Sequence, residues 1–332
     1  MRAVIVEAKG SEAQVREVAE DELLTGVGQG GTVELDVLYS SYNYKDGMAI
    51  NGGGRGILQS FPIIPGIDIV GTVTASEDSK WSAGDTVVLN GDGAGESLNG
   101  GFATRARVRP DALVKLPEAL SPERAAAIGT AGFTAMISVL HLADAGVTPE
   151  SGDVLVTGAA GGVGSVAVSL LAGRGYRVVA STGRVEEEGD YLRGLGAAEL
   201  LDRHELSDEL GKPLQSERWA GAIDVAGGTT LANILAQTQY GGIVSACGLA
   251  QGMDLPTTVT PFILRGVTLT GANSVQAPRS LRERAWAALA EELDLEQLDA
   301  MTSTIGLAET IPYAEQILAG RTRGRTIVDV NA

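Results

Sequence analysis

Hydrophobic and polar residues alternate differently in two parts of the chain. Up to about residue 120 the apolar residues form short β-branched runs between Gly, Asp and Asn, including AVIV, TVELDVLY, IVGTVT and DTVVLN. Such runs are typical of strands joined by tight turns. From about residue 122 to 261, apolar strands alternate with stretches of helical periodicity, which indicates a parallel sheet covered by helices. The pattern predicts an α/β protein in which a largely antiparallel β domain is combined with a doubly wound parallel sheet domain.

The end of the chain bears on how the two domains are connected. A helix-rich tail follows the parallel-sheet region, and its last segment, GRTIVDV, again has the pattern of a strand. If this strand returns to the first domain, the parallel-sheet domain is an insertion. We therefore predict a discontinuous β domain of residues 1–124 and 262–332 and an inserted domain of residues 125–261. A chain of 332 residues is long enough for two such cores.

Charge and cysteine content restrict the partners and the compartment. The chain has 25 basic and 42 acidic residues, a net charge of −17, which disfavours nucleic acid and anionic membranes as partners. The start, MRAVIVEAKG, lacks the apolar core of a secretory signal, and no run reaches the ~20 apolar residues of a membrane span. The single cysteine, Cys247, excludes an intramolecular disulfide. We expect a soluble, cytoplasmic protein.

A glycine-rich loop between a predicted strand and a predicted helix is the clearest chemical signal. The strand Val154–Val156 leads into GAAGGVG, and the following residues have the apolar spacing of a helix. Gly161 would let the backbone approach a pyrophosphate, Gly164 would let helix and strand pack closely, and the helix N-terminus would offer N–H groups to the anion. Ala159 replaces the first glycine of the G-x-G-x-x-G pattern. The strand before it and the helix after it favour a dinucleotide site over a plain turn.

The segment GYRVVASTGR indicates whether the dinucleotide is NAD(H) or NADP(H). Its strand, Arg177–Ala180, should lie beside the first one, and NAD-binding proteins place a carboxylate at the end of this second strand. Here no carboxylate occurs before Glu186, and Arg184 lies twenty residues after Gly164. A guanidinium at this place can bind a ribose 2′-phosphate. The sequence predicts NADPH, and the alternative is that Arg184 is a solvated residue at a helix start.

Several stretches together resemble the medium-chain dehydrogenase/reductase superfamily, and within it the quinone-oxidoreductase-like branch that contains the bacterial acryloyl-CoA reductases. They are SSYNYKDGMAI, FPIIPGIDIVGTV, GGFATRARV, IGTAGFTAM, VTGAAGGVGSVAV, WAGAIDVAGG, YGGIVSACGLA and LPTTVTPFILRGV, which span nearly the whole chain. The resemblance implies a GroES-like catalytic domain around an inserted Rossmann domain, and a homodimer.

The same resemblance predicts a site without zinc. Zinc-dependent relatives have Cys where this chain has Asn43 and His where it has Ile67, and neither residue type is a plausible ligand here. A structural zinc lobe needs four cysteines, which the chain lacks. His141, in a predicted helix, and His204, in a polar stretch, are interpreted as packing or surface residues rather than as ligands.

The resemblance also assigns the residues that would bind the cofactor. It places Tyr44 and Thr130 at the nicotinamide end and Thr182 and Arg184 at the 2′-phosphate. The remaining expected cofactor-binding residues are Ala160, Gly161, Gly162, Val163, Gly183, Arg203, Leu249, Ile263, Ser274 and Arg325. Taken as bare residues, Leu249 and Ile263 would more often belong to a core.

With no zinc ligand to support a Lewis acid, conjugate reduction fits better than alcohol oxidation. Addition of a hydride to the β-carbon of an enoyl thioester leaves an enolate, which needs hydrogen-bond donors at its oxygen and then a proton at the α-carbon. Tyr44 is the first candidate donor, with Asn43 or a backbone N–H assisting; alternatively Tyr44 only positions the ring. Lys45 and Asp46 are interpreted as an ion pair that shapes the loop.

The predicted function is NADPH-dependent reduction of a short 2-enoyl-CoA, with acryloyl-CoA as the expected small-molecule substrate. Reduction of a quinone or another activated alkene is an alternative within the same fold. A protein that binds NADPH without catalysis is an alternative of another class. The phosphates of a CoA substrate would need cations, for which Arg55, Arg279 and Arg282 are possible residues.

Overall fold

The computed structural model describes residues 1–19, 31–51 and 56–332. Arg55, considered above for CoA binding, lies outside these residues. The chain divides into two compact units: residues 1–133, 274–291 and 298–332 form the first, and residues 134–273 and 292–297 form the second. The domain boundaries near residues 124 and 261 stay a prediction.

The first unit is built on a largely antiparallel sheet with the strand order β14-β15-β3-β4-β5-β7, and β6 pairs with β3. The strands are β3 (Val33–Ser41), β4 (Asp68–Ser76), β5 (Thr86–Asn90), β6 (Arg105–Val108), β7 (Val114–Lys115), β14 (Thr302–Gly306) and β15 (Arg325–Asp329). A separate antiparallel pair consists of β1 (Arg2–Ile5) and β2 (Gln14–Glu17). The predicted β-rich first region is confirmed.

The last strand returns to the first unit, as predicted. β15 lies antiparallel to β3, with Ile327 opposite Ser41, so the ends of the chain share one sheet. Its residues Ile327 and Val328 are fully buried, and this burial explains why a short apolar segment at the end of the chain is drawn back to the core. The second unit is therefore inserted within the first.

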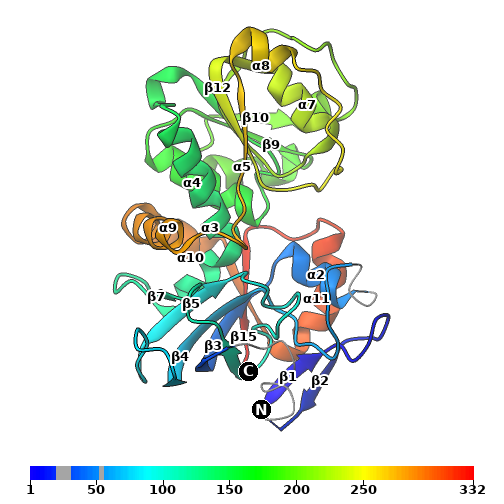
Figure 1. Ribbon diagram of the computed structural model, residues 1–332. Helices are drawn as coiled ribbons and strands as arrows, with labels where there is room; N and C mark the ends of the chain where they lie inside the picture. Colours follow the sequence, from blue (N-terminus) through cyan, green and yellow to red (C-terminus); the bar gives the residue numbers. More distant parts are fainter. Residues whose placement is uncertain (20–30, 52–55) are drawn as a thin grey trace. The chain divides into compact units, whose positions relative to one another are not determined.

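The second unit contains a six-stranded sheet with the order β10-β9-β8-β11-β12-β13, in which all neighbouring strands are parallel (Figure 1). Its strands are β8 (Asp153–Val156), β9 (Val178–Thr182), β10 (Glu199–Asp202), β11 (Trp219–Asp224), β12 (Thr238–Ala246) and β13 (Thr268–Gly271). The connecting helices are α4 (Gly162–Gly173), α5 (Val185–Gly194), α6 (His204–Ser207), α7 (Gly228–Gln237) and α8 (Thr260–Arg265). From β8 the strands are added toward one edge of the sheet as far as β10, and from β11 they are added toward the other edge. The strand order therefore reverses between β8 and β11, and doubly wound sheets bind ligands outside the carboxyl ends of the strands at such a point.

The other helices are α2 (Tyr44–Ile50), α3 (Pro122–Asp144), α9 (Arg279–Glu292), α10 (Leu295–Ala300) and α11 (Thr310–Leu318). By length and composition α3 could cross a membrane, but 89% of its apolar window is buried inside the protein, as in the core helix of a soluble protein. The helix is interrupted at Gly129, whose φ of 49° and ψ of −162° are not helical.

Candidate functional site

The glycine-rich loop joins β8 to α4 in the second unit. Gly158 adopts a positive φ of 56°, and a Cβ at this position would collide with Val225, so the tight turn requires glycine here. Ala159, which replaces the first glycine of the motif, is fully buried. Sequence reasoning did not single out Gly158, because the motif places the turn one residue later.

The following residues expose backbone at the start of α4. Gly161 is exposed, Gly162 and Val163 are half-buried, and Ala160 is buried. The first N–H groups of a helix have no acceptor within that helix, so this end favours an anion. As expected, Gly164 packs closely: a Cβ there would lie 2.6 Å from Cα of Ala159.

Two guanidinium groups flank the carboxyl end of β9. A Cβ at Gly183 would lie 2.6 Å from Nε of Arg203, which shows that the Arg203 side chain lies across the STGR turn. Arg184 follows directly as the N-cap of α5, and its backbone N–H donates to Oγ1 of Thr182 at 3.2 Å. The structure thus brings together Thr182, Gly183, Arg184 and Arg203.

A buried hydrogen-bonded pair joins the ends of β8 and β11, where the strand order reverses. Oγ1 of Thr157 donates to Asp224 at 2.7 Å and accepts the N–H of Val225 at 2.9 Å. The other carboxylate oxygen of Asp224 accepts the N–H of Gly227 at 2.8 Å, and burial raises the pKa of Asp224 above its ordinary value. This pair fixes the crevice of the sheet, and sequence reasoning missed it because its members are separated by 67 positions.

The two apolar residues assigned to the cofactor are exposed in the second unit. Leu249 is 59% exposed and Ile263, on α8, is 71% exposed. The interpretation of both as core residues is therefore wrong. Their exposure leaves them able to contact a ligand or another chain.

In the first unit, Tyr44 is the first residue of α2, and it is 48% exposed. α2 packs closely against α11, because a Cβ at Gly47 would lie 2.7 Å from Cγ2 of Ile317. Tyr42, two residues before the helix, is buried, stacks on Phe102 and donates to the carbonyl of Thr310 at 2.8 Å. These contacts hold the start of α2 and leave the Tyr44 side chain at the surface of its unit.

A buried polar network adjoins the start of α2 and is centred on Asp68, which is 1% exposed. The carboxylate of Asp68 accepts hydrogen bonds from the side chains of Ser41, Asn43 (2.8 Å), Asn90 (2.7 Å) and Thr130 (2.6 Å), and from the backbone N–H of Thr130 (2.9 Å). Sequence reasoning did not identify Asp68. Its one available signal was a carboxylate within an otherwise apolar run, FPIIPGIDIVGTV.

Asp46 is the second carboxylate of this network, and its predicted ion pair with Lys45 is wrong. Asp46 is fully buried and accepts the N–H of Asn43 at 2.8 Å and of Ile67 at 3.0 Å. Burial, together with the charge of Asp68, raises the pKa of Asp46 to about 7. Lys45 pairs instead with Glu96, because consecutive residues at a helix start point in different directions.

Asn43 connects the two carboxylates. Its amide nitrogen lies 2.8 Å from Asp68 and 3.2 Å from Asp46, while its oxygen is 3.5 Å from both terminal nitrogens of Arg325. Asn43 is only 8% exposed. To donate to a substrate, its amide would have to leave these carboxylates.

The remaining expected residues of the first unit differ in exposure. Arg325 is 2% exposed, and its Nε donates to the carbonyl of Ala127 at 2.6 Å, so it belongs to the buried network. Thr130 is half-buried beside Asp68. Ser274 is 8% exposed, and its carbonyl accepts a hydrogen bond from Arg282.

The residues at the two positions considered for zinc do not fit a metal. Asn43 is engaged by carboxylates, and Ile67 has an aliphatic side chain that is 2% exposed. Within residues 1–19, 31–51 and 56–332, no group of three or more His, Cys, Asp or Glu residues is arranged to hold a metal ion. His141 contacts Ser245, and His204 contacts Asp208.

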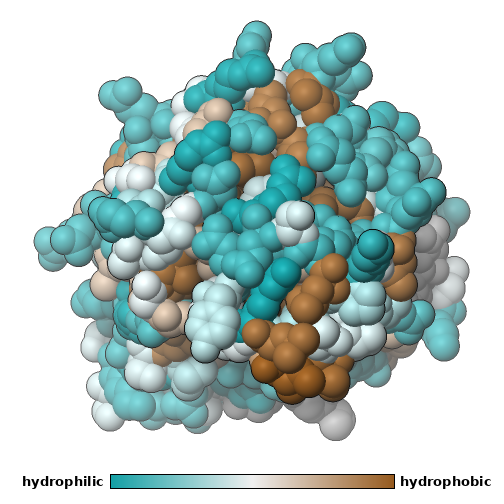
Figure 2. Space-filling view, turned by 90° about the horizontal axis from the view of Figure 1, so that it is seen from above, coloured by the Kyte–Doolittle hydropathy of each residue, from teal (hydrophilic) through white to brown (hydrophobic). Residues whose placement is uncertain are grey.

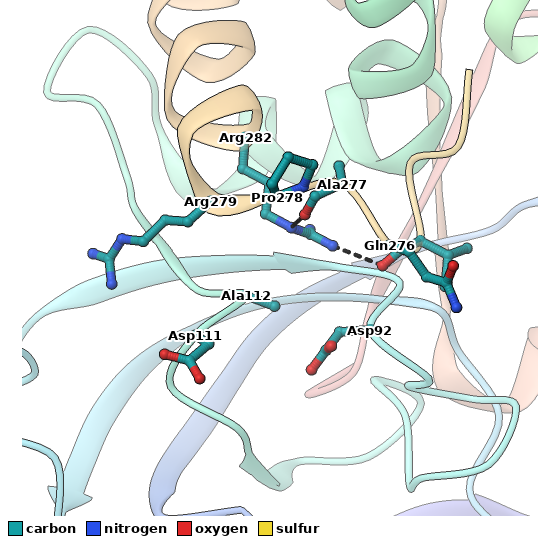
Figure 3. A pocket seen from close by; sticks show the side chains of 9 residues that line it. Asp92, Asp111, Ala112, Gln276, Ala277, Pro278, Arg279 and Arg282 are labelled. Atoms are coloured by element: carbon teal, nitrogen blue, oxygen red, sulfur yellow. Dashed lines mark hydrogen bonds between the residues drawn. The ribbon is translucent and has the colours of Figure 1, made fainter. Parts of the chain in front are cut away.

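A hollow of about 430 Å³ in the first unit contains none of the expected site residues (Figure 3). Arg282 lines it, but this side chain is 2% exposed and donates to the backbone carbonyls of Asn90, Ser274, Val275 and Ala277. Arg282 is thus committed to the fold, and its suggested role in CoA binding is not supported. Arg279 points away from Arg282 in Figure 3 and donates to Glu283 at 2.7 Å.

Together, the sheet of the second unit and its glycine loop define a dinucleotide-dependent oxidoreductase fold. Residues 29–118 match the family model described as alcohol dehydrogenase GroES-like domain, and residues 162–292 match the one described as zinc-binding dehydrogenase. The chain belongs to the medium-chain dehydrogenase/reductase family, and the expected GroES-like and Rossmann domains are confirmed.

Similar proteins place the chain within this family. It is 50% identical over 302 residues to the acrylyl-CoA reductase AcuI of Ruegeria pomeroyi, covering 91% of each chain. It is 46% identical to the putative quinone oxidoreductase YhfP of Bacillus subtilis, covering 89% of each. The solved structure of yhdH from Salmonella enterica in complex with NADP has a TM-score of 0.95 at 48% identity, with 99% of each chain covered. That of Bacillus subtilis yhfP with NAD bound has a TM-score of 0.92 at 42% identity, with 99% of this chain and 98% of that one covered.

Proposed function

We propose that this protein reduces the carbon–carbon double bond of a short 2-enoyl-CoA with NADPH, and that acryloyl-CoA, which yields propionyl-CoA, is its main substrate. The observation that carries this proposal is the 50% identity to an acrylyl-CoA reductase over 91% of both chains. The exposed Tyr44 and the dinucleotide features of the second unit agree with it.

The second unit has the groups that NADPH requires. The exposed backbone of Gly161 and Gly162 at the start of α4 suits a pyrophosphate, and Arg184 and Arg203 suit a 2′-phosphate. No carboxylate stands between the end of β9 and Arg184, where a ribose 2′-hydroxyl would need one. When bound, NADPH supplies the hydride that adds to the β-carbon of the substrate.

The first unit has the groups for the rest of the reaction. We assign to the phenol of Tyr44 a hydrogen bond to the thioester oxygen, which stabilises the enolate as charge develops there. The phenol O–H of a tyrosine can donate such a hydrogen bond. Asn43 and Asp46 hold the first turn of α2, and thereby the position of Tyr44.

The proposal is tested by following NADPH absorbance with acryloyl-CoA, crotonyl-CoA, 1,4-benzoquinone and a simple enone. We expect the highest kcat/KM for acryloyl-CoA. Quinone reduction is the second candidate, favoured by the 46% identity to a putative quinone oxidoreductase, and a higher kcat/KM for benzoquinone would establish it instead. Binding of NADPH without turnover of any substrate would indicate a binding protein.

We further propose that the protein is a cytoplasmic homodimer. β13 is the last strand in the sheet order, so one of its edges has no neighbour in this sheet. Nearby in the sequence, Met253, Val259 and Leu264 are 84%, 67% and 60% exposed. A free edge and exposed apolar side chains favour association. Figure 2 shows a face that is largely hydrophilic (teal) and on which some hydrophobic residues (brown) form a cluster. Sedimentation analysis should give twice the mass of the chain, and a Val259→Asp, Leu264→Asp variant should sediment as a monomer.

A further inference from the structure

We propose that Asp68 is a positioning residue of the reductase site: it accepts the hydrogen bond of the Thr130 hydroxyl, so that this hydroxyl presents its lone pairs to an N–H donor of the ligand. The proposal rests on the proposed function, in which Thr130 lies at the nicotinamide end of NADPH. It concerns a residue that neither the glycine motif nor the resemblance assigns.

Two hydrogen bonds join Asp68 and Thr130. Oγ1 of Thr130 lies 2.6 Å from Oδ1 of Asp68, and the backbone N–H of Thr130 donates to Oδ2 at 2.9 Å. A carboxylate only accepts, so the hydroxyl must be the donor in the first contact. A hydroxyl has one proton, and once this is committed its remaining capacity is that of an acceptor.

The backbone at Gly129 lets Thr130 make these two hydrogen bonds. Gly129 interrupts α3 with a positive φ of 49°, and a Cβ there would lie 2.9 Å from Oδ2 of Asp68 and 2.8 Å from Nη2 of Arg325. Only glycine lets the chain approach the network so closely. The break turns the N–H of Thr130 away from its own helix and toward the carboxylate.

Further hydrogen bonds hold the carboxylate of Asp68 in one orientation. Its carboxylate also accepts from Asn90 at 2.7 Å and from Asn43 at 2.8 Å, and the residue is 1% exposed. Arg325, fully buried near Asn43, supplies the positive charge that offsets the carboxylates. A buried carboxylate with all its hydrogen bonds formed restrains the side chains that donate to it.

The chemistry of this arrangement separates two roles. A hydroxyl that offers lone pairs matches the carboxamide N–H₂ of a nicotinamide. It is unsuited to stabilise an enolate oxygen, which needs a donor. The enolate is therefore left to Tyr44, and Thr130 orients the ring.

The test compares Asp68→Asn, Thr130→Val, Thr130→Ser and the double variant Asp68→Asn, Thr130→Val. An asparagine cannot accept on its nitrogen side, and a valine has no hydroxyl. Each of these two variants should lower kcat/KM by about 10- to 100-fold, as expected when a buried polar group is left without its hydrogen-bond partner. The double variant should be no worse than the poorer single one, since both changes remove the same interaction. Thr130→Ser should retain activity within about threefold, because serine keeps the hydroxyl.

Binding measurements separate positioning from a general loss of structure. Adenosine 2′,5′-bisphosphate has no nicotinamide, and its expected contacts all lie in the second unit. Its dissociation constant should be unchanged in all variants, whereas that of NADPH should rise in Asp68→Asn and Thr130→Val. Asp85→Asn, which removes a surface carboxylate paired with Lys115 in the same unit, serves as the control and should change neither constant.

The outcomes are distinct. Additive effects in the double variant, or equal effects of Thr130→Val and Thr130→Ser, would overturn the assignment of Asp68. If Asp68→Asn does not fold, the valine and serine variants still decide whether the hydroxyl is used. Failure of the wild-type protein to bind either NADPH or adenosine 2′,5′-bisphosphate would instead refute the proposed function.

Discussion

The guanidinium of Arg184 lies 3.3 Å from the carboxylate of Glu188, one turn further along α5. The Glu188 side chain is 7% exposed and that of Arg184 is 30% exposed. The ion pair thus restrains the partly exposed guanidinium, and the Arg203 side chain lies across the neighbouring Gly183. In the NADPH complex that we propose, this end of β9 would bind the 2′-phosphate.

Replacement of Arg184 by alanine should weaken NADPH binding much more than NADH binding. Loss of a hydrogen bond to a charged group costs about 1.5–3 kcal/mol, or roughly 10- to 150-fold in the dissociation constant. Fluorescence titration with both cofactors would measure this. Arg193→Ala, on the same helix, removes an exposed arginine that pairs with Asp190 and should change neither constant. Unchanged discrimination in Arg184→Ala would refute the assignment.

Alanine substitutions at two glycines of the loop should affect different properties, cofactor affinity in one case and stability in the other. At Gly161 a Cβ would approach only the carbonyl of Gly158, at 3.2 Å, so Gly161→Ala should fold but lose NADPH affinity by obstructing the pyrophosphate. At Gly164 a Cβ would meet backbone that cannot move aside, so Gly164→Ala should lower the midpoint of thermal unfolding. Calorimetry and cofactor titration of both variants distinguish these effects. The assignment of the loop fails if Gly161→Ala binds NADPH normally.

Removal of the Tyr44 hydroxyl should slow turnover without weakening NADPH binding. Loss of one donor at a developing oxyanion costs about 10²–10³-fold in kcat. The matched control is Tyr240→Phe, which changes a tyrosine of the second unit that is 79% exposed. Tyr44→Phe with a kcat within about twofold of wild type would remove the phenol from the mechanism.

The buried Asp46 should make stability depend on pH. Its pKa is raised from 3.8 to about 7 in the folded protein, chiefly by burial, so the folded state binds this proton more tightly than the unfolded state. Stability from this group is present at low pH and is lost as pH rises through the interval from 3.8 to about 7. At about 1.4 kcal/mol per pKa unit, the loss reaches about 4 kcal/mol.

Urea unfolding of the wild type and Asp46→Asn between pH 4.5 and 8 checks this expectation. The free energy of unfolding of the wild type, minus that of Asp46→Asn, should decrease as pH rises and should level off above about pH 7. Asp85→Asn should show no such trend in this range, because Lys115 lowers the pKa of Asp85 and the stability from this carboxylate is lost only as pH falls below its ordinary pKa of 3.8. A wild-type advantage over Asp46→Asn that stays constant across this range would contradict the raised pKa.

Local patterns predicted those parts of the protein whose structure depends on neighbouring residues. Alternation of strands and helices after residue 122 gave the parallel sheet, and the glycine spacing placed the loop before α4. The identity of Arg184 at the end of β9 indicated NADPH, and Asn43 and Ile67 argued against zinc. These inferences need only residue types and short spacings, which the chain displays directly.

Only the tertiary structure decided which distant residues meet. Asp68 joins Asn43 and Thr130, which are 25 and 62 positions away, and Arg325 reaches Asn43 across 282 positions. Lys45 contacts Glu96 rather than its neighbour Asp46, Arg282 is enclosed by carbonyls, and Leu249 and Ile263 are exposed rather than buried. No local pattern encodes such contacts, because they depend on strand register and on which face each element buries. The sequence by itself thus determined the type of fold and the glycine-rich loop, while folding determined the buried network at the start of α2.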